Sequence, residues 1–132
     1  MNKFVHIELN TSDVKAAKKF YQGLFDWKMQ DTPMGPMTYT MINTGVKNEG
    51  GGIQQKQMPD APTQWLPYVQ VESVKKTVAK AGTRGAQVIV AYQPIGEMGA
   101  IGVFVDPTGA MLGVWENAQK PAKKNAKKAK KK

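Results

Sequence analysis

The segment Phe4–Phe25, FVHIELNTSDVKAAKKFYQGLF, decides the fold of this chain. Its first seven residues alternate between two faces, which predicts a strand over Phe4–Asn10 with His6 and Glu8 opposite the aliphatic side chains. Threonine, serine and aspartate side chains then offer helix N-caps, and lysines separate apolar residues at helical spacing. The segment therefore predicts a strand followed by an amphipathic helix that reaches its last residue.

The rest of the first half predicts three short strands, over Trp27–Gln30, Thr38–Asn43 and Ile53–Lys56. Pro33, Gly35 and Pro36 favour a turn between the first two of these strands. The run Gly50–Gly52 permits backbone conformations that are closed to other residues. Because neither a Lys-Ser/Thr pair nor a helix follows it, this run is unlike a phosphate loop. We interpret it as a bulge or as the rim of a pocket.

The second half repeats the same order after a proline-bearing linker over Met58–Gln64. Its predicted elements are a strand, a helix and three strands, over Trp65–Glu72, Ser73–Ala81, Ala86–Tyr92, Gly99–Asp106 and Met111–Asn117. Gly82 and Gly85 supply the stop of the helix, and the turn Asp106–Gly109 joins the last two strands. The order β-α-β-β-β therefore occurs twice.

The two halves can be registered on the starts of their predicted helices. Placing Asp13–Lys15 on Ser73–Lys75 superimposes the non-helix faces of the two first strands, with His6 on Leu66, Glu8 on Tyr68 and Asn10 on Gln70. Helices on one face of a mostly antiparallel sheet make an α+β protein. The sequence therefore predicts an α+β fold of two βαβββ modules.

Length and composition indicate one domain. The 132 residues, 41% of them hydrophobic, are enough for a single core, which we place over residues 1–118. The chain has no cysteine, so disulfides, thiolate chemistry and cysteine-based metal sites are excluded. It also lacks an apolar run long enough to span a membrane and a secretory leader pattern, which favours a soluble, cytoplasmic protein.

The net charge of +9 belongs to the end of the chain, where eight of the 19 basic residues lie within residues 120–132. We expect residues 119–132 to be a disordered tail, because residues 120–132 contain only lysine, alanine, asparagine and proline, which cannot bury enough apolar surface to offset the entropy of ordering. One interpretation is a solvated, self-repelling tail. The alternative is weak, non-specific and salt-sensitive binding to nucleic acid or another anionic surface.

Several features together make the chain resemble the vicinal oxygen chelate superfamily, which includes glyoxalase I, extradiol dioxygenases and bleomycin resistance proteins. They are His6 ahead of Asp13, the segment FYQGLFDW over Phe20–Trp27, the Gly50–Gly52 run and the turn DPTG over Asp106–Gly109. The resemblance covers residues 3–117. It implies a curved mixed sheet from paired modules, about 3–57 and 65–117, around a small-molecule cavity with the helices outside. It also implies a homodimer.

Family enzymes hold a divalent metal in this cavity with ligands from the first and last strand of each module. By position only His6 matches here, because Leu66 and Gly113 stand where the second module would supply ligands. The equivalent strand of the first module offers Ile53–Gln55, without a carboxylate or imidazole. One imidazole cannot hold a divalent ion with useful affinity, so we predict no metal and no other cofactor. The disfavoured alternative is a divalent metal on rearranged ligands including His6 and Glu8.

The candidate site residues lie mostly on the predicted cavity faces. His6, the only histidine, and Glu8 are candidate catalytic residues that could orient a carbonyl compound for enolisation. The alternative is a histidine hydrogen-bonded inside the core. The candidate ligand-binding residues are Trp27, Tyr39, Trp65, Tyr68, Gln70 and Trp115, for which ordinary core packing or a dimer interface is the alternative. For Met41 and Phe104 we favour core packing.

Three functions follow from these observations. The first is a metal-independent small-molecule-binding protein that sequesters its ligand or catalyses a lyase or isomerase reaction. The second is a metal-dependent enzyme of glyoxalase or dioxygenase type that uses His6 and Glu8. The third is a nucleic-acid-associated protein that acts through its basic tail. The sequence favours them in this order.

Overall fold

The computed structural model describes residues 1–118 of the chain. Within them lie the helices α1 (Val14–Leu24) and α2 (Val74–Thr83). The strands are β1 (Phe4–Thr11), β2 (Lys28–Met34), β3 (Met37–Asn43), β4 (Gly50–Gln55), β5 (Gln64–Gln70), β6 (Gln87–Ile95), β7 (Gly99–Val105) and β8 (Met111–Asn117). Neither of these two helices is long and apolar enough to cross a membrane. The predicted basic tail, with its nucleic-acid binding, falls on residues 119–132, outside the described residues.

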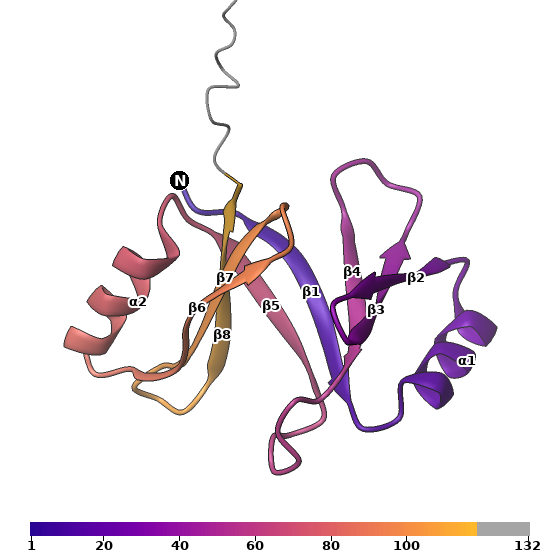
Figure 1. The fold of residues 1–132 in the computed structure, drawn as a ribbon, viewed down its shortest axis with the longest axis horizontal. Coiled ribbons are helices and arrows are strands. Elements are labelled where there is room, and N and C mark those ends of the chain that lie inside the picture. Colours follow the sequence, from indigo (N-terminus) through magenta and orange to yellow (C-terminus); the bar gives the residue numbers. More distant parts are fainter. Residues whose placement is uncertain (119–132) are drawn as a thin grey trace, which may run out of the picture.

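The strands of the described part form one sheet in the order β2-β3-β4-β1-β5-β8-β7-β6. In each module the first and last strands are parallel, and all other neighbours are antiparallel. β1 and β5 join the modules, with His6 opposite Tyr68 and Glu8 opposite Leu66. The sheet curls between α1 and α2, which lie at opposite ends of the molecule (Figure 1). The predicted fold class is confirmed, and both modules come from one chain.

Both helices begin at the residues that the register predicts. The Asp13 carboxylate accepts a hydrogen bond from the N–H of Ala16 at 3.0 Å, and the Ser73 hydroxyl accepts one from the N–H of Lys76 at 3.1 Å. These N-caps satisfy donors that the first helical turn leaves unpaired. At the other end of α2, Gly85 has a φ of 99° just past the helix. Gly82, the other predicted stop, lies inside α2.

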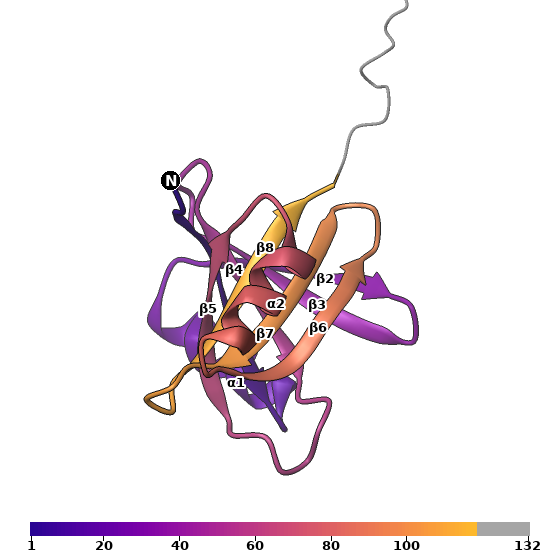
Figure 2. The same cartoon turned by 90° about the vertical axis from the view of Figure 1, so that its left-hand side faces the viewer.

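The two helices pack differently against the sheet. α2 lies across β6, β7 and β8 (Figure 2), and its Val74 and Val78 are buried. α1 has no buried residue, and its apolar side packs beside a small cluster of Leu9, Ile42 and Ile53. The second module therefore contains the more tightly packed helix.

The interpretation of Gly50–Gly52 as a bulge is wrong, because these glycines form the first half of β4 and pair in register with β3. Gly50 and Gly51 line a separate pocket beside Ile42. A β-carbon on Gly51 would collide with the carbonyl oxygen of Ile7 in β1, and one on Gly52 would collide with the Tyr39 ring. Glycine is needed here because a neighbouring backbone and an aromatic ring approach the strand closely.

The two edge strands run further than the sequence predicts, and each contains a proline. β2 continues through Pro33, and β6 continues through Pro94. Proline stops a strand in the middle of a sheet but is tolerated at an edge, where its missing N–H leaves no neighbour unpaired. The predicted turn around Pro33 therefore shrinks to Gly35 and Pro36, with φ at Gly35 of 62°.

The predicted turn at Asp106–Gly109 is confirmed between β7 and β8. One oxygen of Asp106 accepts hydrogen bonds from the N–H and hydroxyl of Thr108, each at 2.7 Å, and from the N–H of Ala110 at 3.1 Å. These donors lower the pKa of the Asp106 carboxyl. Gly109 completes the turn with a φ of 100°. The motif that carried the family resemblance is therefore a structural turn.

Candidate functional site

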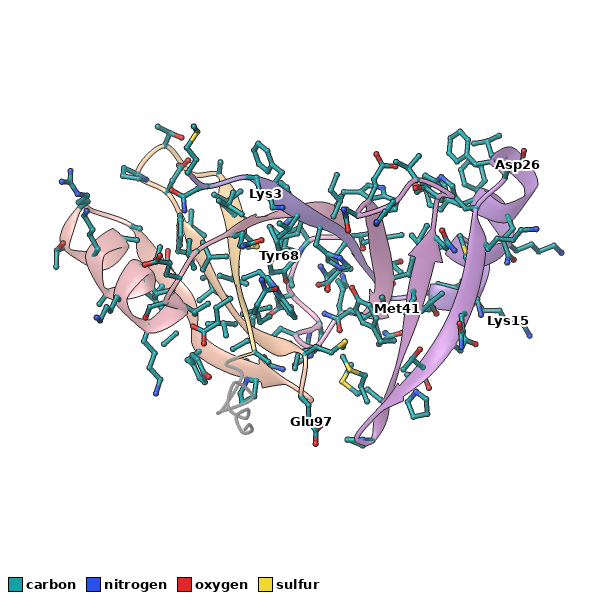
Figure 3. All side chains as sticks on the ribbon, turned by 90° about the horizontal axis from the view of Figure 1, so that it is seen from above. Lys3, Lys15, Asp26, Met41, Tyr68 and Glu97 are labelled. Atoms are coloured by element: carbon teal, nitrogen blue, oxygen red, sulfur yellow. The ribbon has the colours of Figure 1, made fainter. Side chains whose placement is uncertain are left out.

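A cavity of about 510 Å³ lies on the concave side of the sheet, where the two modules meet. Seen from above, Tyr68 and Met41 lie between the two halves, whereas Lys15 and Asp26 lie out at the α1 end (Figure 3). Among the lining residues are His6, Glu8, Asn10, Met34, Tyr39, Met41, Gln54, Met58, Leu66, Tyr68, Gln70, Ile89, Val90, Met98, Ile101, Val103, Met111 and Trp115. Most of the exposed lining is therefore aliphatic, aromatic and thioether surface. Further polar residues also line it, namely Lys3, Asn48, Lys56, Gln57, Gln64, Gln93 and Asn117.

The structure brings together most of the residues that the sequence predicts for the site. Both candidate catalytic residues line the cavity, as do four of the candidate ligand-binding residues, Tyr39, Tyr68, Gln70 and Trp115. Met41, which we expected in the core, also lines the cavity. Phe104 packs against the core cluster under α2.

Trp27 and Trp65 lie elsewhere, so we correct their assignment. Both pack around Tyr21 of α1 on the other face of the sheet, and the indole N–H of Trp65 donates to the Tyr21 hydroxyl at 3.2 Å. The alternation that points Leu66 into the cavity turns its neighbour Trp65 to the helix side. Aromatic character alone therefore misassigned these two residues.

Glu8 lies buried at the base of the cavity, with 6% of its surface exposed. Its Oε1 accepts a hydrogen bond from the Tyr39 hydroxyl at 2.9 Å, and its Oε2 accepts from the Gln54 amide at 3.0 Å and the Tyr68 hydroxyl at 3.3 Å. Burial raises the pKa of the Glu8 carboxyl, and these donors oppose the rise. A carboxylate this deep is stable only because both of its oxygens have donors.

His6 connects to Glu8 through Tyr39. The Nε2 atom of His6 lies 2.6 Å from the Tyr39 hydroxyl oxygen, which itself lies 2.9 Å from the Glu8 carboxylate. Burial lowers the pKa of His6 below its usual value near 6.5, which favours the neutral imidazole. Because Tyr39 gives its single proton to Glu8, Nε2 of His6 is the donor to Tyr39. The second ring nitrogen, Nδ1, then carries a lone pair.

The two tyrosines come from strands that do not correspond, but their rings lie over matching glycines of the two modules. The Tyr39 ring lies over Gly52 of β4, and the Tyr68 ring lies over Gly113 of β8. Burial raises the pKa of each phenol, and the neighbouring Glu8 charge raises it further. Both tyrosines therefore stay protonated and act as hydrogen-bond donors at any ordinary pH.

The side chains present do not fit a family-type metal centre. Residues 1–118 contain no group of three or more histidine, cysteine, aspartate or glutamate side chains placed to hold an ion. Gly113 stands where a ligand carboxylate was expected, and any side chain there would run into the Tyr68 ring. A divalent ion needs three or four donors, and the two available, His6 and Glu8, already bond to Tyr39.

Gln54 is a site residue that the sequence reasoning did not select. Its amide donates to Glu8 and to the side-chain oxygen of Asn10, both at 3.0 Å. It sits opposite Asn10 in the parallel pairing of β1 with β4. The signal was present, since β4 had to supply a residue to the cavity, but the glycine run obscured where that strand begins.

Comparison with known families gives one match over most of the chain. Residues 3–114 match the sequence profile of the Glyoxalase/Bleomycin resistance protein/Dioxygenase superfamily.

Two curated relatives are longer than this chain. A Mycobacterium tuberculosis protein named "Putative glyoxylase CFP32" is 34% identical over 116 residues, which cover 83% of this chain and 44% of that protein. The anthracycline biosynthesis protein DnrV of Streptomyces peucetius is 27% identical over 125 residues, which cover 82% of this chain and 44% of that protein. The chain therefore spans less than half the length of both.

Solved structures share the fold at low identity. A hypothetical protein of Bacillus halodurans, BH1468, matches with a TM-score of 0.66 and 14% identity, over 89% of this chain and 96% of its own. Methylmalonyl-CoA epimerase from Mycobacterium tuberculosis matches with a TM-score of 0.65 and 10% identity, over 91% of each chain. At such identities the likeness concerns the fold alone.

Proposed function

Because the chain belongs to the glyoxalase/bleomycin resistance protein/dioxygenase superfamily, we propose that it binds a small, largely apolar carbonyl compound without a metal. The observation that carries this proposal is the cavity between the modules. Its volume of about 510 Å³ is typical of small-molecule sites, as is its combination of apolar walls with a few convergent polar groups. A ligand held there is sequestered from water on most of its surface.

The composition of the walls favours an aromatic or otherwise flat ligand. Five methionines, Met34, Met41, Met58, Met98 and Met111, line the cavity together with Trp115. Thioether side chains adapt their shape to a ligand and make favourable contacts with aromatic rings. One relative is named for anthracycline biosynthesis, and anthracyclines are flat aromatic carbonyl compounds. We therefore assign the ligand to this chemical class.

The polar groups favour a ligand that carries an oxygen function. His6, Gln70 and the Glu8 network line the cavity together with further amide and lysine side chains, namely Lys3, Asn48, Lys56, Gln57, Gln64, Gln93 and Asn117. A buried polar group lowers the affinity for any ligand that leaves it unpaired. A carbonyl or hydroxyl placed toward these side chains therefore gives the ligand its orientation.

The proposal is tested by filling the cavity. Met41→Trp should place an indole in the space that a ligand needs, because Met41 lines the cavity and is 37% exposed. Phe20→Trp is the matched control, since Phe20 lies on the exposed side of α1. Thermal shift against a panel of aromatic ketones and anthracyclines should show stabilisation of the wild type and of Phe20→Trp, and none of Met41→Trp. Equal stabilisation of all three proteins would place the ligand elsewhere.

A second candidate function is a lyase or isomerase reaction on the same ligand class. The hydrogen-bonded chain from His6 through Tyr39 to Glu8 favours it, because it links an imidazole at the cavity to a buried carboxylate. Metal analysis of protein purified without chelator separates it from a metal-dependent enzyme. We expect substoichiometric zinc, nickel, manganese and iron, and one equivalent of any of them would contradict the metal-independent proposal.

A further inference from the structure

We propose that Tyr39 relays a proton between His6 and Glu8, so that Nδ1 of His6 is the base toward a ligand C–H bond next to a carbonyl. This inference rests on the proposed function, because the ligand must occupy the cavity. It assigns to Tyr39 the role of a positioning and relay residue, and to Glu8 the role of final proton acceptor.

The geometry carries the relay. Two successive hydrogen bonds, of 2.6 Å from His6 Nε2 to the Tyr39 oxygen and of 2.9 Å from that oxygen to Glu8 Oε1, form an unbroken path. Among residues 1–118 no side chain or backbone group is hydrogen-bonded to Nδ1, and His6 lines the cavity. The path therefore runs from a side chain that lines the cavity to a buried carboxylate.

The proton movements balance without any further reactant. Nδ1 uses its lone pair to take the proton from carbon, and the C–H electron pair forms a C=C bond while the carbonyl π pair moves to oxygen. The Nε2 proton moves to the Tyr39 oxygen, and the Tyr39 proton moves to Glu8 Oε1. The result is an enolate, a neutral imidazole protonated on Nδ1, a neutral phenol and a neutral carboxylic acid. Reversal of these movements returns a proton to carbon.

This arrangement suits a buried site because it moves a charge without creating one. Before the step the negative charge lies on Glu8, and afterwards it lies on the enolate. A histidine acting alone would leave an imidazolium in a place where burial disfavours the charged form. Glu8, held by Gln54 and Tyr68 as well as Tyr39, is fixed in position in both states.

The second tyrosine provides a matched control. Tyr39 and Tyr68 are both buried, both lie over a glycine, and both donate to Glu8. Only Tyr39 is hydrogen-bonded to His6, since the Tyr68 ring meets the imidazole edge-on with centroids 5.9 Å apart. Tyr39→Phe therefore interrupts the relay, whereas Tyr68→Phe only removes one donor to the carboxylate.

The first arm of the test needs no ligand. His6 is the only histidine, so ¹⁵N-histidine labelling gives one pair of ring signals that report which nitrogen carries the proton. We expect the wild type and Tyr68→Phe near neutral pH to carry the proton on Nε2, and Tyr39→Phe to lose this preference. A wild-type proton on Nδ1 would overturn the proposal, because Nδ1 would then have no lone pair to act as a base.

The second arm measures the reaction on 1,2-diphenylethanone, an aromatic ketone with one CH₂ group beside its carbonyl. Proton NMR in D₂O follows exchange of that group, and circular dichroism checks that each variant is folded. We expect the wild type to accelerate exchange, with a loss of about tenfold or more in Tyr39→Phe and His6→Ala and a smaller loss in Tyr68→Phe. Tyr92→Phe should leave the rate unchanged, because the Tyr92 ring does not line the cavity and lies under the Lys75 ammonium of α2.

The two arms separate failure of the relay from failure of the proposed function. If the ketone raises the melting temperature but exchanges equally fast with the wild type and Tyr39→Phe, the relay is wrong and ligand binding stands. If the ketone neither binds nor exchanges, the proposed ligand class is wrong, and the ¹⁵N signals still decide whether Nδ1 can be the base.

Discussion

The cavity faces of the two modules carry different chemistry at matching positions. In the first module the linked side chains are His6, Glu8 and Tyr39. The strand registers place Leu66 and Tyr68 at the first two of these positions and Ile101 at the third. Leu66 thus replaces His6, and Ile101 replaces Tyr39, so two of the three hydrogen-bonded side chains correspond to aliphatic residues. The first module supplies the linked polar groups at the base of the cavity, and the second has aliphatic residues at two of the three matching positions.

On the side of the sheet that faces the helices, the second module is the more closely packed of the two. α2 approaches the sheet closely because Gly102 of β7 has no side chain, and a β-carbon there would lie 2.7 Å from Val78 and 2.9 Å from Val74. The matching residue in β3 is Thr40, which is buried and donates to Asp31 at 2.7 Å. The second module holds its helix by buried valines, whereas the first holds α1 by partly buried apolar and aromatic side chains and by the ion pair of Lys18 with Asp31. We infer that stability is concentrated in the second module.

The largest expected effect compares the first residues of the two helices. Val74→Ala should lower the free energy of unfolding by about 2–3 kcal/mol, because it leaves a hole in a fully buried site. Val14→Ala, at the matching position of α1, should cost about 1 kcal/mol, because Val14 is only partly buried. Urea unfolding of both variants measures the difference. Equal losses of unfolding free energy would show that the two helices pack equally tightly against the sheet.

The next effect compares the residues beneath the helices. Gly102→Ala should cost about 2 kcal/mol, since the new methyl group must displace Val74 and Val78. Thr40→Ala removes one hydroxyl hydrogen bond to Asp31 and should cost about 1 kcal/mol. Urea midpoints again give the comparison. A harmless Gly102→Ala would show that α2 is not held as closely as we describe.

A smaller, pH-dependent effect concerns Glu8. Burial raises the pKa of its carboxyl above the usual value near 4.5, so the folded state binds this proton more tightly than the unfolded chain does. The free energy of unfolding should therefore fall as pH rises from about 4.5 to the folded-state pKa, by about 1.4 kcal/mol for each unit of the shift. Glu8→Gln should lack this decline in urea titrations between about pH 4 and 8. If the free energy of unfolding falls equally with pH in the wild type and in Glu8→Gln, another titrating group causes the decline.

The smallest expected effect concerns the exposed side of α1. Phe20 is 61% exposed, and the matching residue of α2 is Lys80. Phe20→Lys should change the free energy of unfolding by no more than about 0.5 kcal/mol, because the ring is mostly in water already. Light scattering on the same variant and on the wild type also tests the homodimer, which stays a prediction. A large loss of stability would mean that this face is covered.

The sequence predicted the module repeat and the cavity faces, because both depend on local periodicity. The alternation of β1 predicted that His6 and Glu8 share one face of the strand. Aligning the two helix starts then predicted that Leu66 and Tyr68 lie on the matching face of β5. The same alternation would have excluded Trp65 from the cavity. That error arose because aromatic character was given more weight than the face of the strand.

The link between His6, Tyr39 and Glu8 could not be predicted from the sequence. Tyr39 lies 31 residues from Glu8 along the chain, and only the pairing of β3 with β4 and of β4 with β1 brings them together. That pairing depends on Gly52, whose missing side chain makes room for the Tyr39 ring. A glycine in a strand indicates that another group approaches closely, but the sequence does not say which side chain that is.

The central claim is that a ligand binds in the cavity between the modules, and tryptophan fluorescence tests it most directly. Of the three tryptophans, only Trp115 lines the cavity, while Trp27 and Trp65 pack on the other face. We predict that an aromatic ketone quenches the tryptophan fluorescence of the wild type and of Trp65→Phe. The fluorescence of Trp115→Phe should not be quenched. Quenching that survives in Trp115→Phe and is lost in Trp65→Phe would contradict the claim.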